Sequence, residues 1–235
     1  MYVFELIKPG TWLASPDDPR VRFTVEALLG LLGDCLADAA ISLTLFESSC
    51  ALNRESRAGG ARTKTEWPVS SGSVPASYSH RLPFIHAKSC VFALDSIAKT
   101  IRQLSRQDAA PADVAASYDE LVKFLPALQD VRDSAHHPED RIRGVQRSNM
   151  PLVLKAVDNR FMKAPAGVAL IVDALVGNRY GGTMASGEYG EVEISAASVT
   201  AARDAIQRVY LAYPWKGPGC LLPYRASEAW NPPPP

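Results

Sequence analysis

Histidine and cysteine are scarce in this 235-residue sequence, with four residues of each, and its 25 basic and 25 acidic residues cancel. A net charge of zero excludes a global field that would draw the protein to nucleic acid or acidic lipid, so a polyanion would need a local binding site. The cysteines are too widely spaced for a zinc motif or a dense disulfide framework, and we expect reduced thiols. We expect neither a metal nor another cofactor.

A long uninterrupted apolar run is also missing. The most hydrophobic stretch, residues 25–46, contains Glu26, Asp34 and Asp38, which a membrane-spanning helix would tolerate poorly. Residues 1–6 lack the basic segment and apolar run of a signal peptide. The sequence therefore predicts a cytoplasmic protein with no membrane partner.

Apolar residues make up 47% of the chain and charged residues 21%, which is typical of soluble globular proteins. Apolar positions recur in steps of three and four over residues 22–54, 83–106 and 112–137, which predicts three long helices. In the first of these, some apolar residues lie off the main stripe, so we expect this helix to be covered on more than one side. The residues off the stripe are Leu31, Ile41 and Leu45.

The remaining segments predict loops and strands. Residues 55–82 are rich in glycine, serine and proline and are locally basic, which favours a mobile loop that either is simply solvated or touches a phosphate backbone. Short β-prone runs are separated by glycine after residue 147, and an amphipathic helix is expected near the end, followed by a frayed proline-rich tail. The expected strands are residues 2–7, 152–157, 168–176 and 188–194, with a hairpin turn at 177–182 and the last helix at 198–213.

These patterns predict an α+β fold that is mainly α, in two parts. Residues 1–148 would form an antiparallel helical bundle with the N-terminal strand and the mobile loop. Residues 149–235 would form a small antiparallel β-sheet with one packed helix and the tail.

The clearest chemical cluster lies at the end of the third predicted helix, where Arg132 and Asp133 are followed by His136, His137 and Pro138. Proline disfavours helical geometry in the residue before it, so the helix should stop at about His137. Cleavage of RNA by its own 2′-hydroxyl needs a group that moves a proton near pH 7 and a cation for the developing phosphorane charge. Histidine and arginine supply these two functions without a metal. At about 100° per residue, His136 lies about 40° from Arg132 around the axis and His137 about 140°, but the proline break frees His137 to turn back, so both remain candidates.

Arg132, the polar Asp133 and His137 resemble the R-x(4 to 6)-H signature of HEPN domains, in which a polar residue commonly follows the arginine near the end of a long bundle helix. The resemblance covers residues 20–148. It implies a metal-independent endoribonuclease that acts as a homodimer and belongs to a toxin or phage-defence system, often with a protein antitoxin. Arg132 would then bind the scissile phosphate, His137 or His136 would transfer the proton, and Asp133 would orient one of them.

The same residues also have plainer interpretations. Arg132 and His136 could serve as cations that interact favourably with the helix dipole at the C-terminus, and Asp133 could be a solvated acid. Three further arginines, Arg141, Arg143 and Arg147, follow closely and would either position phosphates or solubilise a loop.

Three functions remain open at this point. The first is the endoribonuclease. The second is a non-catalytic bundle of the same kind that binds a nucleotide, RNA or a protein partner, which the neutral net charge favours. The third is a hydrolase that uses Cys90, because His86 lies four residues earlier on the same face of the second helix.

Overall fold

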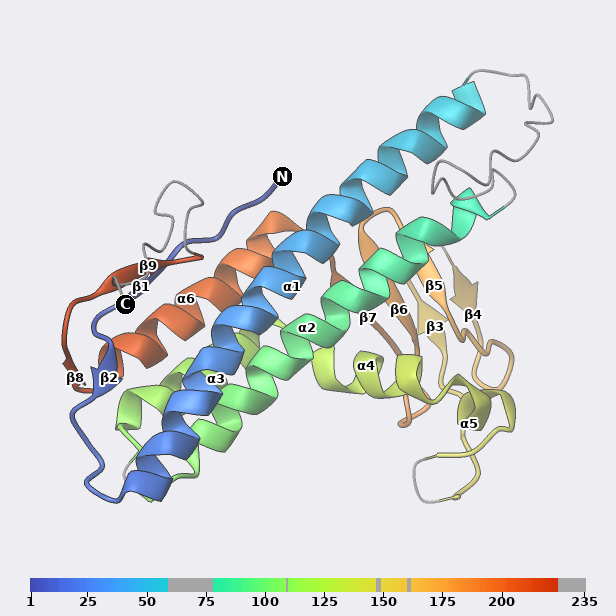
Figure 1. Ribbon diagram of the computed structural model, residues 1–235. Coiled ribbons are helices and arrows are strands. Elements are labelled where there is room, and N and C mark those ends of the chain that lie inside the picture. Colours follow the sequence, from blue (N-terminus) through green and yellow to red (C-terminus); the bar gives the residue numbers. More distant parts are fainter. Residues whose placement is uncertain (59–77, 109, 147–148, 160–161, 224–235) are drawn as a thin grey trace.

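The computed structural model describes residues 1–58, 78–108, 110–146, 149–159 and 162–223 (Figure 1). In this part of the chain the fold is α+β and mainly helical, as the sequence predicts. The helices are α1 (Pro19–Ala58), α2 (Leu82–Ser105), α3 (Ala112–Phe124), α4 (Leu128–His136), α5 (Pro138–Ile142) and α6 (Ala196–Ala212), with one 3-10 turn, η1 (Ser79–Arg81). Most of the expected mobile loop 55–82 and all of the proline-rich end lie outside the described residues.

The strands are short and antiparallel and form four separate sheets. Three sheets are pairs, and the fourth is a three-stranded meander. The pairs are β1 (Leu6–Lys8) with β9 (Cys220–Leu222), β2 (Trp12–Leu13) with β8 (Trp215–Lys216), and β3 (Val157–Asp158) with β4 (Lys163–Ala164). The meander is β5 (Ala174–Val176), β6 (Arg179–Thr183) and β7 (Tyr189–Glu193).

The two longest helices, α1 and α2, pack side by side, and α6 packs on both of them and on α3. Pro19 occupies the first position of α1, and the Asp18 carboxylate accepts hydrogen bonds from the N–H groups of Arg20 and Val21. Both features favour helix initiation at this point. One apolar core joins residues from β1 through α6, so the stretches on either side of residue 148 share it.

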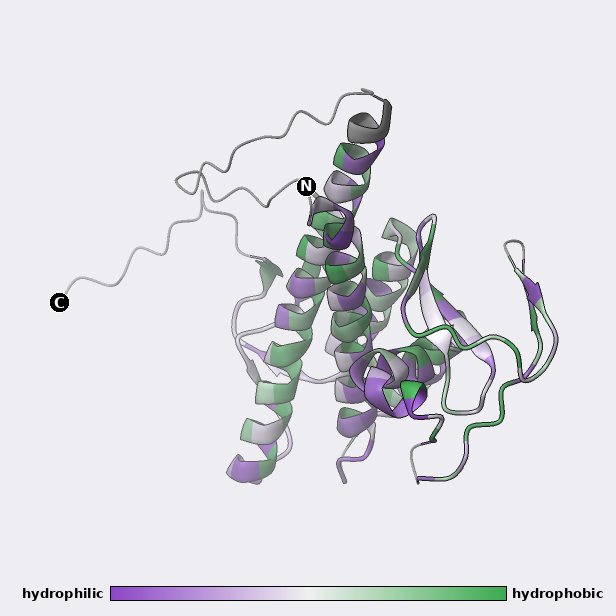
Figure 2. Ribbon diagram, turned by 90° about the vertical axis from the view of Figure 1, so that its right-hand side faces the viewer, coloured by the Kyte–Doolittle hydropathy of each residue, from purple (hydrophilic) through white to green (hydrophobic). Residues whose placement is uncertain are grey.

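The strands lie on two sides of the helices. In both ribbon views β8 and β9 lie on one side of the bundle and the meander lies on the other (Figure 2). The meander packs through β6 and β7 on α4, which fixes the short helix that carries the candidate residues.

Several expectations about secondary structure were wrong in detail. The third predicted helix is interrupted between Phe124 and Leu128, because Pro126 cannot continue a helix, and α3 and α4 result. The last predicted helix, α6, packs in the bundle, and α4 takes the expected place on the sheet. The N-terminal strand, expected at residues 2–7, is limited to Leu6–Lys8 and pairs with β9.

The strand predictions had a mixed outcome. Residues 188–194 are confirmed as β7, and the turn at Gly177 between β5 and β6 is confirmed as a hairpin. Only the ends of the other two expected strands, residues 157 and 174–176, have strand geometry. β6 was not predicted, because its adjacent glycines, Gly181 and Gly182, resemble a turn. A Cβ on Gly181 would lie only 2.1 Å from the carbonyl oxygen of Gly190, so close strand pairing excludes a side chain there.

The helix α1 packs on α2 and α6, and the Tyr2 N–H donates to the Thr44 hydroxyl of α1. Leu31, Ile41 and Leu45, which suggested further cover, are 44%, 52% and 44% exposed, so the described residues do not bury these three side chains. By length and composition alone, Pro19–Arg54 could also cross a membrane. Because its apolar stripe forms the core with α2, we describe it as the central helix of a bundle. The cytoplasmic location stays a prediction.

A buried tyrosine ties α6 to α1. The Tyr210 hydroxyl, on a side chain that is 1% exposed, donates a 2.8 Å hydrogen bond to the carbonyl oxygen of Leu29. Tyr210→Phe is expected to lower the free energy of unfolding by about 1 kcal/mol, because a buried hydrogen bond is lost at nearly constant volume. Urea unfolding at constant m-value measures this change. The matched control is Tyr78→Phe at an exposed tyrosine, and an equal loss in both variants would contradict the assignment.

Candidate active site

The candidate residues lie at the junction of α4 and α5. The last residue of α4 is His136, and the next residue, His137, leaves helical geometry with φ −122° and ψ 56°. Its N–H still donates to the Asp133 carbonyl oxygen at 3.1 Å, and Pro138 begins α5. The predicted end of the helix at His137 is therefore confirmed, and the proline explains it.

Arg132 is held by three neighbours. Its Nε lies 3.2 Å from Oδ2 of Asp95, and its Nη1 donates to Oδ1 of Asp133 at 2.9 Å. The Nε atom is buried and makes no directed hydrogen bond, so its link to Asp95 is an ion pair at contact distance. The guanidinium carbon also lies 5.2 Å from the centre of the Phe92 ring. Only a quarter of the Arg132 side chain is exposed, so its position is set by α2 as much as by α4.

Asp95, on α2, is a buried acid that the sequence reasoning missed. Its side chain is 4% exposed and also pairs with Lys99 at 2.7 Å. Burial raises the pKa of Asp95, and the two cations Lys99 and Arg132 offset part of this effect. The sequence did hold a signal, because Asp95 interrupts the apolar stripe that contains Val91 and Leu94.

The two histidines lie next to each other at the solvent-exposed side of the junction. The His136 ring centre is 5.8 Å from that of Phe92 and 4.7 Å from that of His137, in edge-to-face geometry with the latter. Arg132 and His136 therefore contact the same aromatic ring from one helix, one turn apart. The contacts form a chain that runs from Arg132 through Phe92 and His136 to His137.

A carboxylate adjoins the outer histidine. Oε1 of Glu139 lies 3.4 Å from Nδ1 of His137, which is half exposed. A hydrogen bond within Glu139 itself, and to a smaller degree its neighbour His137, lowers the pKa of Glu139, so this group is ionised at neutral pH. A carboxylate at Nδ1 favours the tautomer that carries its proton there and leaves Nε2 free to accept one.

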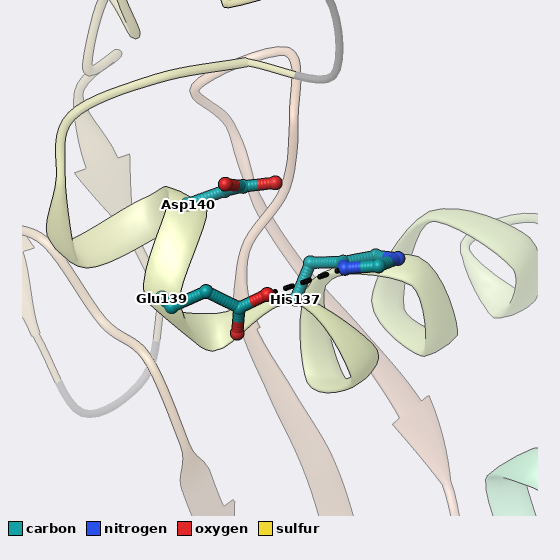
Figure 3. Close-up of side chains that lie close together, drawn as sticks. All are labelled: His137, Glu139 and Asp140. Carbon is teal, nitrogen blue, oxygen red and sulfur yellow. Dashed lines mark hydrogen bonds and ion pairs between the residues drawn. The ribbon is translucent and has the colours of Figure 1, made fainter.

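These side chains also form the group best suited to hold a metal among the described residues. One ligand atom each from His137, Glu139 and Asp140 lies within 4.8 Å of the others (Figure 3). A mixed imidazole and carboxylate set suits Zn²⁺ or Mn²⁺. All three residues come from one short stretch of chain. Oδ1 of Asp140 also lies 3.7 Å from Nη1 of Arg143, so this carboxylate is shared with an ion pair.

The three arginines proposed for RNA contact differ in their surroundings. Arg141 is buried, and its Nη1 donates to the Val145 carbonyl oxygen at 2.7 Å, so this guanidinium stabilises the turn after α5. Arg143 has a side chain that is 65% exposed and is therefore accessible to a phosphate. Arg147 lies outside the described residues.

The surroundings of Cys90 do not suit a catalytic nucleophile. Cys90 is fully buried between α1 and α2, its Sγ lies 4.0 Å from the Ala39 carbonyl oxygen, and burial raises the pKa of its thiol to about 12. A thiol of this kind holds too little thiolate to act as a nucleophile. We therefore discard the cysteine hydrolase.

No protein-family model matches the chain, and comparison with curated proteins and with solved structures finds no match. The resemblance to HEPN domains thus stays a prediction based on the motif.

Proposed function

We propose that the protein is a metal-independent endoribonuclease of the HEPN type whose active site is the junction of α4 and α5. The observation that carries the proposal is the chain of contacts from Arg132 through Phe92 and His136 to His137, because it gathers one permanent cation and two imidazoles at the C-terminal end of α4, beside the middle of α2. The expected toxin or phage-defence role, with a protein antitoxin, follows from the family resemblance alone.

The proposed chemistry needs two imidazoles, one guanidinium and the RNA. Nε2 of His137 accepts the proton of the ribose 2′-hydroxyl as its oxygen attacks the adjacent phosphorus. The bond from phosphorus to the 5′-oxygen then breaks, and a second imidazole supplies the proton that this leaving oxygen takes up. Arg132 stabilises the charge on the phosphorane oxygens through its guanidinium. The products are a 2′,3′-cyclic phosphate and a free 5′-hydroxyl.

The second imidazole has two sources in this proposal. It is His136 of the same chain or, in a homodimer, a histidine of the second copy brought across one groove by a twofold axis. Asp133 and Asp95 keep the guanidinium in place. Arg143 is the exposed arginine of the group that would contact the RNA backbone.

The experiment is to incubate the purified protein with total RNA and with a labelled oligonucleotide in excess EDTA. We expect cleavage that persists in EDTA and yields cyclic phosphate ends. Resistance to periodate excludes a free 2′,3′-diol at the new 3′ terminus, and resistance to phosphatase until mild acid opens the ring identifies the cyclic phosphate. Cleavage that requires added Mn²⁺ or Zn²⁺ would contradict the metal-independent mechanism and would direct attention to His137, Glu139 and Asp140 as ligands.

A second candidate is supported by the charges around Arg132. Two carboxylates already pair with this guanidinium, so its attraction for phosphate is weak. This favours a non-catalytic module that recognises a nucleotide, RNA or a protein at the same place. If the unaltered protein cleaves no RNA but binds it in a manner that Arg132→Ala abolishes, this alternative holds.

A further inference from the structure

A mostly apolar cavity lies on the other side of the bundle from the meander. It has a volume of about 690 Å³, is partly open to solvent and is lined by the N-terminal segment, α1, α6 and the last strands. Pockets of roughly 300–1,000 Å³ with mainly apolar and aromatic walls and a few polar groups are typical of small-molecule sites. Its aromatic wall consists of Tyr2, Phe4, Tyr210 and Trp215.

Two glycines of α1 line the cavity. Gly30 is exposed at its rim, and a Cβ placed there would meet no atom within 4 Å. A Cβ on Gly33 would lie 3.5 Å from the Tyr210 hydroxyl and 3.8 Å from Leu222, which form the opposite wall. Glycine costs a helix about 1 kcal/mol relative to alanine, so its presence in mid-helix reduces stability while leaving this volume empty.

The charged groups at the cavity define its polar end. The Lys8 ammonium lies 5.2 Å from the centre of the Trp215 ring and has no carboxylate partner among the described residues. The Glu26 carboxylate already has a hydrogen-bond partner, because its Oε1 accepts from the Leu13 N–H at 2.8 Å. Asp34 also lines the cavity but is exposed, so water weakens its field, whereas Lys8 is half-buried against an aromatic ring and gains more from an ion pair.

We propose that this cavity binds an aliphatic carboxylate, with the chain over Gly30 and Gly33 and the headgroup at Lys8. The apolar walls suit an unbranched hydrocarbon, and the half-buried ammonium is complementary to a carboxylate. The site is remote in sequence and structure from the junction of α4 and α5, so this inference does not depend on the proposed nuclease activity.

The experiment is calorimetric titration of the full chain with decanoate, 1-decanol and decyltrimethylammonium below their aggregation limits. We expect decanoate to bind most tightly and dodecanoate about tenfold more tightly still, because each buried methylene adds to the affinity. Lys8→Met keeps the aliphatic stem but removes the charge. This variant is expected to weaken the binding of decanoate about tenfold and to leave the affinity for 1-decanol unchanged.

The decisive variant is Gly30→Leu, which places a side chain in the cavity. We expect it to abolish decanoate binding while raising the midpoint of thermal unfolding by about 2–4 °C, because leucine favours the helix. The matched control is Ala27→Leu, one turn earlier on α1 and outside the cavity, which should bind decanoate normally. No binding by the unaltered chain, binding that survives Gly30→Leu, or tighter binding of decyltrimethylammonium than of decanoate would each overturn the proposal.

Discussion

Replacement of Arg132 or His137 by alanine is expected to reduce the rate of RNA cleavage by about 10²-fold to 10⁴-fold. Proton transfer by a positioned side chain and stabilisation of developing charge each contribute on this scale. Both side chains are at least a quarter exposed, so their removal leaves no deep cavity, and we expect the folded structure to persist. The measurement is the single-turnover rate in EDTA at equal protein concentration.

Matched controls separate the proposed site from a general loss of charge. His86→Ala removes a histidine on α2, and Arg208→Ala removes an arginine of α6 that pairs with Glu120. Both controls are expected to cleave within about twofold of the unaltered protein. His136→Ala tests whether the second imidazole comes from the same chain. A loss of cleavage rate as large as in His137→Ala would identify both histidines as proton carriers. Unchanged cleavage in Arg132→Ala and His137→Ala together would remove the assigned site.

Asp95→Asn is expected to slow RNA cleavage by at least about tenfold without lowering stability. The buried carboxylate places the guanidinium of Arg132, and an error of about 1 Å in such a group can cost a factor of 10² in rate. Burial raises the pKa of Asp95, so this carboxyl stabilises the native state most when it is protonated. This contribution to stability is lost as the pH rises from the ordinary pKa of 3.8 through the raised pKa of the native state. Asparagine resembles the protonated form, so the variant should be no less stable than the unaltered protein at pH 7.

Two measurements together test this prediction. Denaturant unfolding at pH 7 and below pH 4 should show the difference between Asp95→Asn and the unaltered protein shrinking at low pH. Single-turnover cleavage at pH 7 should fall in the same variant, whereas Asp119→Asn, at an exposed acid in the middle of α3, should change neither quantity. A loss of stability in parallel with the loss of activity would mean that Asp95 has only a structural role.

The helices were predictable because their apolar periodicity is local. The bounds of α2 and the stop of α4 at His137 follow from spacing and from prolines within a few residues. The same rule, applied to Pro126, would have separated α3 from α4, but the regular series of leucines around it concealed the break.

The surroundings of the site could not be predicted in the same way. Phe92 and Asp95 reach Arg132 only because α2 packs across α4, and a contact between helices leaves no spacing rule in a single sequence. The burial of Arg141 could not be predicted either. In the sequence it is equivalent to Arg143, and only the turn after α5 encloses its guanidinium. Asp95 alone carried a local signal, as a charge within an apolar stripe.

The most direct test of the account is whether Arg132 and His137 meet the same substrate. NMR spectra of the protein, with the Arg132 Nε and the His137 ring assigned, would be recorded during titration with an RNA oligonucleotide that carries 2′-fluoro groups and cannot be cleaved. The account predicts that both resonances shift along one saturation curve. It is contradicted if the oligonucleotide binds while both resonances stay in place.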